Sequence, residues 1–182
     1  MNALILTGSP KPEGQTAQMA RLLAQSLPGE TRFLHAYSLQ VAPCMDCGFC
    51  RTRFACPVQD EQQQVLQQLL WAQAVVVASP VYFYGVPAPL KQVFDRCQPF
   101  WCARVLRKEK PAIKKGAVLL AGGAPSHPSQ FDGARQTISG WFREIGAESC
   151  GEVLFPGTDK TALSQQPILQ EQIKALAQSL LK

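Results

Sequence analysis

Long hydrophobic runs are absent from this sequence. The longest uninterrupted aliphatic stretches, Ala74–Ala78 and Ala117–Ala121, are far shorter than the ~20 residues of a membrane-spanning helix. The apolar start, Ala3–Leu6, follows no basic segment and is broken by Gly-Ser-Pro at residues 8–10, which argues against a secretory signal peptide. The sequence therefore predicts a cytoplasmic protein that does not bind a membrane.

Histidine and net charge are also scarce. Two histidines, His35 and His127, are too few for a histidine-built metal site. The formal net charge is only +5, and no nucleic-acid-binding module accompanies the basic residues between Lys91 and Lys115. A solvated basic face is the simplest interpretation of that stretch, and attraction of a phosphorylated ligand is the alternative. We therefore expect no nucleic-acid partner.

What the sequence does have is enough apolar residues for one packed core. Its 182 residues are 46% hydrophobic, and the length is close to that of one α/β domain of about 150 residues. We expect a single domain over residues 1–182, with a cysteine-rich loop at about 42–58.

Short apolar runs alternate along the chain with amphipathic stretches. Three of the runs are continuously apolar, as expected for parallel strands that are covered on both faces. Five strands that alternate with five helices predict an α/β fold with a doubly wound parallel sheet. The predicted strands are Ala3–Thr7, Thr31–Ser38, Ala74–Ser79, Ala117–Gly122 and Glu148–Phe155, and the predicted helices are Thr16–Leu27, Asp60–Ala72, Pro87–Cys97, Ser129–Ile145 and Ile168–Leu181.

Two of these helices carry explicit end signals. Asp60 can cap the second helix, with Gln63 three residues later reaching back to it. Gly146 follows the apolar stripe of the fourth helix and predicts its C-terminal end.

The loop after the first strand has the composition of a phosphate site. A turn rich in Gly, Ser and Thr, residues 8–16, leads into a helix whose N-terminus presents free backbone N–H groups. The spacing of Gly8 and Gly14 does not fit a Walker loop, and the dinucleotide-binding fingerprint Gly-x-Gly-x-x-Gly is absent. The loop therefore predicts a phosphate site of another type, with a plain βα turn as the alternative.

Two further loops follow predicted strands. Three consecutive aromatic residues, Tyr82, Phe83 and Tyr84, follow the third strand. A flat aromatic ligand could cover them; the alternatives are that they cover the sheet edge or form an oligomer contact. The fourth strand ends in Gly122 and Gly123, which would let backbone N–H groups approach the edge of a ring. Because ligands of such sheets bind at the carboxyl ends of the strands, the three loops are expected to form one site.

Together these segments resemble the NAD(P)H-dependent FMN reductases, a family of flavodoxin-like fold. The matching segments are Gly-Ser-Pro-Lys at 8–11, Gly-Gln-Thr at 14–16, Ser-Pro-Val-Tyr at 79–82, Leu-Lys at 90–91 and Asp-Arg at 95–96. The resemblance covers essentially the whole chain. Within the family, the cysteine run at 44–56 is similar to the compact motif of the iron–sulfur flavoproteins, although it lacks their glycine before the last cysteine.

The resemblance implies three groups of FMN-binding residues. The group that would hold the phosphate is Ser9, Lys11, Gln15 and Thr16, with Gln15 standing where the family more often has Asn. The group that would line the isoalloxazine ring is Pro80, Val81, Tyr82 and Phe83. The group at the other edge of the ring is Gly122 and Gly123.

Four of the seven cysteines, Cys44, Cys47, Cys50 and Cys56, fall within 13 residues. In a reducing compartment such clustering indicates metal or redox chemistry. Four thiolates can hold a [4Fe–4S] cluster, whereas zinc ribbons separate two Cys-x2-Cys pairs by a longer stretch. Iron–sulfur, zinc and metal-free thiols all remain open. Because the run follows the second strand, we expect it at the same sheet edge as the phosphate and aromatic loops.

The other three cysteines, Cys97, Cys102 and Cys150, are expected to pack as small apolar residues.

These features predict an FMN-dependent oxidoreductase. By the resemblance, NAD(P)H or a reduced carrier protein would donate electrons to flavin, quinone or another small acceptor, with the cluster as a further carrier. No side chain is expected to act as a catalytic acid or base, because the flavin takes up the hydride. The alternative is a flavodoxin-like electron carrier, which the basic pI of about 8.9 disfavours. The resemblance also implies a homodimer or homotetramer.

Overall fold

The structure is a computed structural model that describes residues 1–182. Five parallel strands form one sheet in the order β2-β1-β3-β4-β5. The strands are β1 (Asn2–Thr7), β2 (Glu30–His35), β3 (Ala74–Pro80), β4 (Lys114–Ala121) and β5 (Ala147–Phe155). The prediction of a flavodoxin-like, doubly wound parallel sheet of five strands is confirmed.

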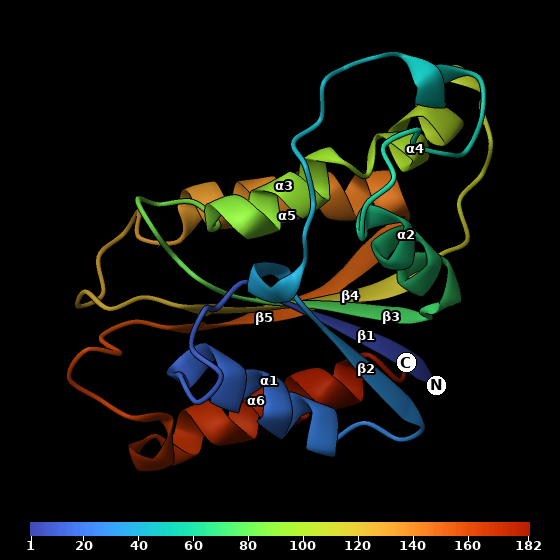
Figure 1. Cartoon of the computed structure of the whole chain (residues 1–182). Coiled ribbons are helices and arrows are strands. Elements are labelled where there is room, and N and C mark those ends of the chain that lie inside the picture. The colour runs from blue at the N-terminus through green and yellow to red at the C-terminus, as the bar shows by residue number, and fades with distance from the viewer.

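Helices cover both faces of the sheet, as Figure 1 shows. One face is covered by α1 and α6, and the other by α2, α3 and α5. A short helix, α4, continues into a π-helical turn, η3. The helices are α1 (Gln15–Gln25), α2 (Gln62–Trp71), α3 (Ala88–Asp95), α4 (Gln98–Trp101), η3 (Cys102–Leu106), α5 (Asp132–Ile145) and α6 (Pro167–Ser179).

The central strands are apolar throughout because both of their faces are buried. Successive side chains of a strand point to opposite faces, so Leu4 and Leu6 of β1 enter one core while Ala3 and Ile5 enter the other. The first core contains 24 buried residues and lies under α2, α3 and α5; the second contains 19 and lies under α1 and α6. The sheet edge that carries the loops is thereby held between two packed layers.

The predicted helix ends are present. Asp60 Oδ1 accepts a hydrogen bond from the backbone N–H of Gln62 at 3.0 Å, and the N–H of Asp60 donates to Gln63 Oε1 at 3.3 Å. Gly146 ends α5 in the left-handed conformation, with φ of 75°. A side chain is disfavoured there, and glycine adopts this conformation without cost.

Several predicted ends differ from the structure. β4 begins at Lys114 rather than Ala117, and α5 begins at Asp132 rather than Ser129. The predicted strand Thr31–Ser38 is too long: β2 ends at His35, and residues Ala36–Ser38 form a single 3₁₀ turn, η1. The predicted helix Pro87–Cys97 ends at Asp95, and the chain then makes α4 and η3, which were not predicted. Each of these added elements is too short to show a clear hydrophobic period.

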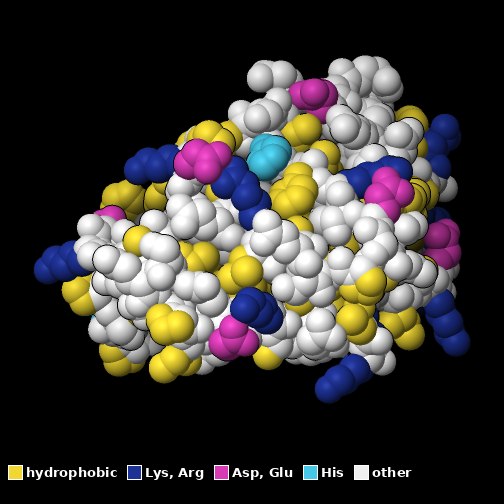
Figure 2. Space-filling view, turned by 90° about the horizontal axis from the view of Figure 1, so that it is seen from below, with side chains coloured by type: hydrophobic (Ala, Val, Ile, Leu, Met, Phe, Trp, Pro, Cys, Tyr) yellow, Lys and Arg dark blue, Asp and Glu magenta, His cyan; other side chains and the backbone are white.

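The face formed by α1 and α6 carries a mixed surface. Figure 2 shows basic and acidic side chains in neighbouring positions there, among polar and hydrophobic ones. Among the helices, none is both long and apolar enough to cross a membrane.

Candidate functional site

A cavity of about 470 Å³ opens at the carboxyl edge of the sheet. It lies where the strand order reverses between β1 and β3, which is the position where doubly wound sheets bind ligands. Its volume is within the range of about 300–1,000 Å³ that is usual for small-molecule sites. We call it the switch-point cavity; it is lined by Ser9, Lys11, Gly14, Gln15, Thr16, Pro80, Val81, Tyr82, Ala121, Gly123, Thr158 and Asp159.

The first wall of this cavity is the N-terminus of α1. Gly14 precedes the helix and no side chain caps it, so the N–H groups of the first turn remain available to a ligand. Thr16 is 3% exposed, and its hydroxyl makes no hydrogen bond within the chain. Ser9 Oγ accepts a hydrogen bond from the N–H of Lys11 at 3.2 Å, which shapes the loop. The N–H groups, the hydroxyl groups and the helix dipole together suit an anion.

Close packing explains one of the glycines in this loop. The N–H of Gly8 donates to the carbonyl of Ala78 at 2.8 Å, at the end of β3. A Cβ atom at position 8 would lie 2.8 Å from both Leu90 and Ser79 Oγ. The loop after β1 can therefore approach β3 and α3 this closely only because residue 8 lacks a side chain.

The aromatic segment after β3 forms a tight turn. Tyr82 and Gly85 exchange two backbone hydrogen bonds of 3.0 Å each, and the central residues, Phe83 and Tyr84, have φ of 48° and 65°. Positive φ at both central positions is typical of turns that favour Asn-Gly, and for bulky residues it costs roughly 1–3 kcal/mol each. Tyr82 lines the cavity, whereas Phe83 points into solvent and is fully exposed.

The third wall is formed by the ends of β4 and β5. Gly123 lines the cavity, whereas Gly122 is buried beneath it beside the Gln130 side chain. A Cβ atom on Gly123 would lie 2.6 Å from a carboxylate oxygen of Asp159. Thr158 and Asp159 also line the cavity and were not predicted, because the loop after β5 carries no motif that indicates a ligand.

The loop after β5 is tied to α1. Gln15 Oε1 accepts a hydrogen bond of 2.7 Å from the N–H of Leu163. The amide oxygen of Gln15 is therefore already used, while its NH₂ group stays free to donate to a ligand.

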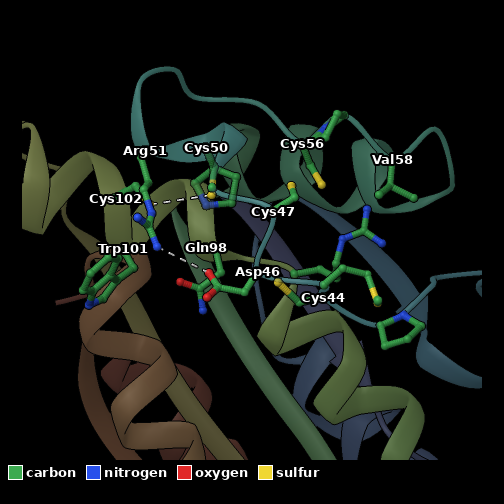
Figure 3. Close-up of a pocket in the computed structure, with 16 residues that line it drawn as sticks. Cys44, Asp46, Cys47, Cys50, Arg51, Cys56, Val58, Gln98, Trp101 and Cys102 are labelled. Carbon is green, nitrogen blue, oxygen red and sulfur yellow. Dashed lines mark hydrogen bonds and ion pairs between the residues drawn. The ribbon is translucent and has the colours of Figure 1, made fainter.

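The predicted cysteines line a different cavity, of about 330 Å³ (Figure 3). Its residues come from the segment between β2 and α2 and from the segment after α3. We call it the cysteine cavity; its lining includes Cys44, Asp46, Cys47, Cys50, Arg51, Cys56, Val58, Arg96, Gln98, Trp101 and Cys102.

The four predicted cysteines surround this cavity but do not converge. Cys44 and Cys47 are exposed, and Cys50 and Cys56 are half-buried. No three Cys, His, Asp or Glu side chains lie close enough together to bind one metal ion. The four cysteines have the composition of a Cys₄ site, but the loop would have to tighten to bring their sulfurs to one centre.

A fifth cysteine, Cys102, lies beside Cys50. The thiol of Cys102 donates to Cys50 Sγ at 3.6 Å. Burial, together with the adjacent Cys102 thiol, raises the pKa of Cys50 to about 11. The contact of Cys102 with Cys50 was not predicted, because Cys102 lies about 50 residues from Cys50 in the chain and belongs to a short, unpredicted turn.

Arg96 holds both ends of the cysteine-rich segment. Its guanidinium donates to the carbonyl of Ala42 at 2.7 Å and to the two carboxylate oxygens of Asp60 at 2.8 and 3.1 Å. The N–H of Ala42 in turn donates to Asp60 at 2.9 Å. Burial opposes the charge of Arg96, but its hydrogen bonds to Asp60 and the nearby Cys56 raise its pKa overall. The segment is thus clamped where it leaves the fold and where it returns.

The two cavities lie apart in the chain's own fold, and no residue lines both. Figure 1 shows the segment after η1 rising away from the sheet edge and passing over the helical layer to reach α4. The expectation that the cysteine run lies beside the phosphate and aromatic loops is therefore wrong for a single chain. The end of β2 indicates where the segment begins, but Arg96 and α4 determine where it packs.

The sheet order and the position of the switch-point cavity define this chain as a flavodoxin-like α/β protein. Over residues 1–145 it matches the model of the NADPH-dependent FMN reductases. The chain belongs to this family of oxidoreductase enzymes.

Similar proteins support the same assignment. An iron–sulfur flavoprotein of Methanosarcina thermophila is 33% identical over 153 residues, which are 81% of this chain and 75% of that protein. Another from Methanocaldococcus jannaschii is 33% identical over 121 residues, 64% of this chain and 63% of that protein. An FMN-dependent NADH-azoreductase of Bacillus anthracis, solved with FMN, covers 100% of both chains with a TM-score of 0.72 and 13% identity, and so shares the fold.

Proposed function

We propose that the switch-point cavity binds FMN and that the protein passes electrons from NAD(P)H to a small acceptor such as a quinone or a free flavin. The observation that carries this proposal is the uncapped N-terminus of α1, which opens into the cavity beside the unpaired hydroxyl of Thr16. The phosphate would bind to that terminus, to Ser9 and to Lys11. Bound FMN would supply hydride uptake and electron transfer, which no amino-acid side chain provides.

The other walls of the cavity would orient the ring. Tyr82 offers an aromatic face at the end of β3, and Pro80 and Val81 add apolar contact. Gly123 leaves its backbone open to the ring edge on the opposite side. Phe83 and Gly122 are outside the lining, so their predicted roles as ring contacts are the least supported of the set.

A flavin assay tests this proposal. The protein is purified without oxygen, its bound FMN is measured, and the oxidation of NADPH and of NADH is followed with a quinone or free FMN as acceptor. We expect about one FMN per chain and turnover with at least one nicotinamide. An FMN-loaded protein that turns over only when a separate reductase is added would instead be an electron carrier, and this result would overturn the enzyme proposal.

We further propose that Cys44, Cys47, Cys50 and Cys56 bind one [4Fe–4S] cluster, which would supply one-electron transfer. The support is the set of four cysteines around one cavity, together with the clamp of Arg96 on the ends of the segment. Metal binding would contribute the folding energy that this exposed loop otherwise lacks.

Metal analysis after anaerobic reconstitution with iron and sulfide tests the cluster. We expect about four irons per chain, lost in Cys47→Ser and retained in the matched control Cys150→Ser, since Cys150 lies on β5 outside the cysteine cavity. Stoichiometric zinc, or no metal under these conditions, would overturn the cluster proposal.

We also propose a homodimer or homotetramer in the cytoplasm. Phe83 is fully exposed and Tyr84 is 57% exposed, on a turn whose backbone is strained. A second subunit would bury these rings and offset the strain. Seven free cysteines fit a reducing compartment. Light scattering on the eluted protein measures the mass, and a monomer at micromolar concentration would contradict the assembly.

A further inference from the structure

Two short turns bring the sulfurs of Cys50 and Cys102 together. Cys50 belongs to η2 (Phe49–Arg51), in the cysteine-rich segment, and Cys102 begins η3, after α4. Their Sγ atoms are 3.6 Å apart and form the one hydrogen bond between two of the seven thiols. π-helical turns such as η3 are rare and often occur at functional sites.

Two further contacts hold these turns against each other. Arg107, directly after η3, donates a hydrogen bond to the carbonyl of Cys50 at 2.9 Å. Phe54, from the cysteine-rich segment, and Phe100, from α4, pack edge to face with their ring centroids 4.8 Å apart. The proximity of the two sulfurs is therefore supported by a hydrogen bond and an aromatic pair, in addition to their own contact.

We propose that Cys50 and Cys102 form a reversible disulfide under oxidising conditions. A disulfide needs its sulfurs at about 2.05 Å, so the pair must approach by a further 1.5 Å or so from its present hydrogen-bonded distance. Cys50 is half-buried and faces the cavity, whereas Cys102 is 2% exposed. An oxidant would therefore reach Cys50 before Cys102, and Cys102 would act as the resolving thiol. Because the raised pKa of Cys50 leaves little thiolate at neutral pH, this oxidation should be slow.

The oxidant is hydrogen peroxide, and the reaction balances in two steps. The sulfur of Cys50 attacks one peroxide oxygen, the O–O bond breaks, and the products are Cys50 sulfenic acid and water. The sulfur of Cys102 then attacks Cys50 Sγ, the S–O bond breaks, and a second water leaves. Both thiol protons end in water, and the two electrons lost by the sulfurs reduce the peroxide. A small dithiol reverses the change by thiol–disulfide exchange.

The disulfide would control the proposed cluster, and this consequence rests on the proposed function. Cys50 cannot be both a disulfide sulfur and a thiolate ligand. The oxidised protein should therefore take up little iron until it is reduced, whereas FMN binding should be unchanged because the switch-point cavity shares no residue with the cysteine cavity.

Peptide mapping tests the disulfide directly. Metal-free, FMN-loaded protein is treated with equimolar hydrogen peroxide, its remaining thiols are alkylated in denaturant, and the chain is cut with chymotrypsin. Cleavage after Phe49 and Trp101 separates Cys50 from Cys47 and Cys102 from Cys97, which trypsin would not do. We expect the thiol count to fall from seven to five and a linked peptide pair containing Cys50 and Cys102 that dithiothreitol separates.

Two variants make the result specific. In Cys102→Ser, Cys50 should be trapped as sulfenic acid by dimedone, and no linked pair should appear. In the matched control Cys150→Ser, the pair should form as in the natural chain. A disulfide from Cys50 to Cys44, Cys47 or Cys56, or a Cys102 that is still fully alkylated after oxidation, would overturn the inference.

The same preparation separates this inference from the cluster proposal. A linked pair in a protein that binds no iron even when kept reduced would support the disulfide and overturn the cluster. Four irons in the reduced protein, with no linked pair after oxidation, would do the reverse.

Discussion

Replacing Arg96 by methionine should destabilise the protein by about 3 kcal/mol. Methionine retains an unbranched apolar stem and removes the guanidinium, which is buried with a side chain 1% exposed. The Asp60 carboxylate, 13% exposed, then loses both of its hydrogen bonds from Arg96, and the carbonyl of Ala42 loses one. Removing one partner of a buried ion pair typically costs about 3–5 kcal/mol, and the partial exposure of Asp60 favours the lower figure.

Urea unfolding of the metal-free protein at pH 7 measures this loss. Arg21→Met is the matched control, because Arg21 pairs with Glu13 through two hydrogen bonds of 2.8 Å in an exposed position. Exposed pairs contribute little to stability, so the control should leave the unfolding midpoint almost unchanged. If Arg96→Met costs less than about 1 kcal/mol, the clamp is not the buried ion pair we describe.

The pH dependence of this difference has a defined sign. Burial works to raise the pKa of Asp60, but hydrogen bonds from Arg96 and from the backbone of Ala42 and Gln62 lower it overall. A carboxyl with a lowered pKa in the folded state stabilises the fold above its unfolded pKa of about 3.9. That stability is lost as the pH falls through the lower, folded pKa. The gap between the natural chain and Arg96→Met should be full near pH 7 and narrow below about pH 4.

The switch-point cavity yields three further predictions. Thr16→Val should weaken FMN binding by roughly 10- to 150-fold, which is the effect of losing one hydrogen bond to a charged group. Riboflavin lacks the phosphate, so its binding should weaken much less. Equal losses of affinity for both ligands in a fluorescence titration would put the phosphate elsewhere. Tyr82→Ala should lower the FMN binding energy by about 1–3 kcal/mol, as for aromatic stacking on bases, with the apo-protein's stability nearly unchanged because the ring is 46% exposed; an apo loss of about 3–5 kcal/mol would indicate a core residue instead. Asp159→Asn should raise the two-electron reduction potential of bound FMN by on the order of 20 mV, because one exposed negative charge beside the cavity no longer opposes reduction; an unchanged or lower potential in a redox titration would refute this role.

The central part of the fold was predictable because its strands are buried on both faces. The runs at Ala74–Ala78 and Ala117–Ala121 are apolar at every position, and such runs in a chain of this length have little alternative to a covered parallel sheet. The edge strand β2 is different. Only Leu34 of β2 is buried, so its sequence does not mark where it ends, and the following residues Ala36–Ser38 resembled more strand although they form a 3₁₀ turn.

The candidate site also has a part that the sequence predicts and a part that it does not. Loops that directly follow β1, β3 and β4 were located correctly at the sheet edge, because a strand end fixes the start of a short loop. Asp159 lies farther along a loop without a motif, and Cys102 meets Cys50 only through the packing of α4. Contacts of this kind depend on tertiary structure, and local sequence patterns do not encode them.

The clamp at Arg96 has a consequence for how the cysteine-rich segment can act. Closing a flexible loop costs entropy that grows with the number of residues in the loop, and Arg96 holds Ala42 beside Asp60 through its own hydrogen bonds. The remaining cost of gathering the cysteines is therefore confined to the residues between these anchors. The switch-point cavity does not depend on that step, because it shares no lining residue with the cysteine cavity. Loss of metal, or a Cys50–Cys102 disulfide, should thus alter this segment locally while the flavin-binding edge keeps its shape.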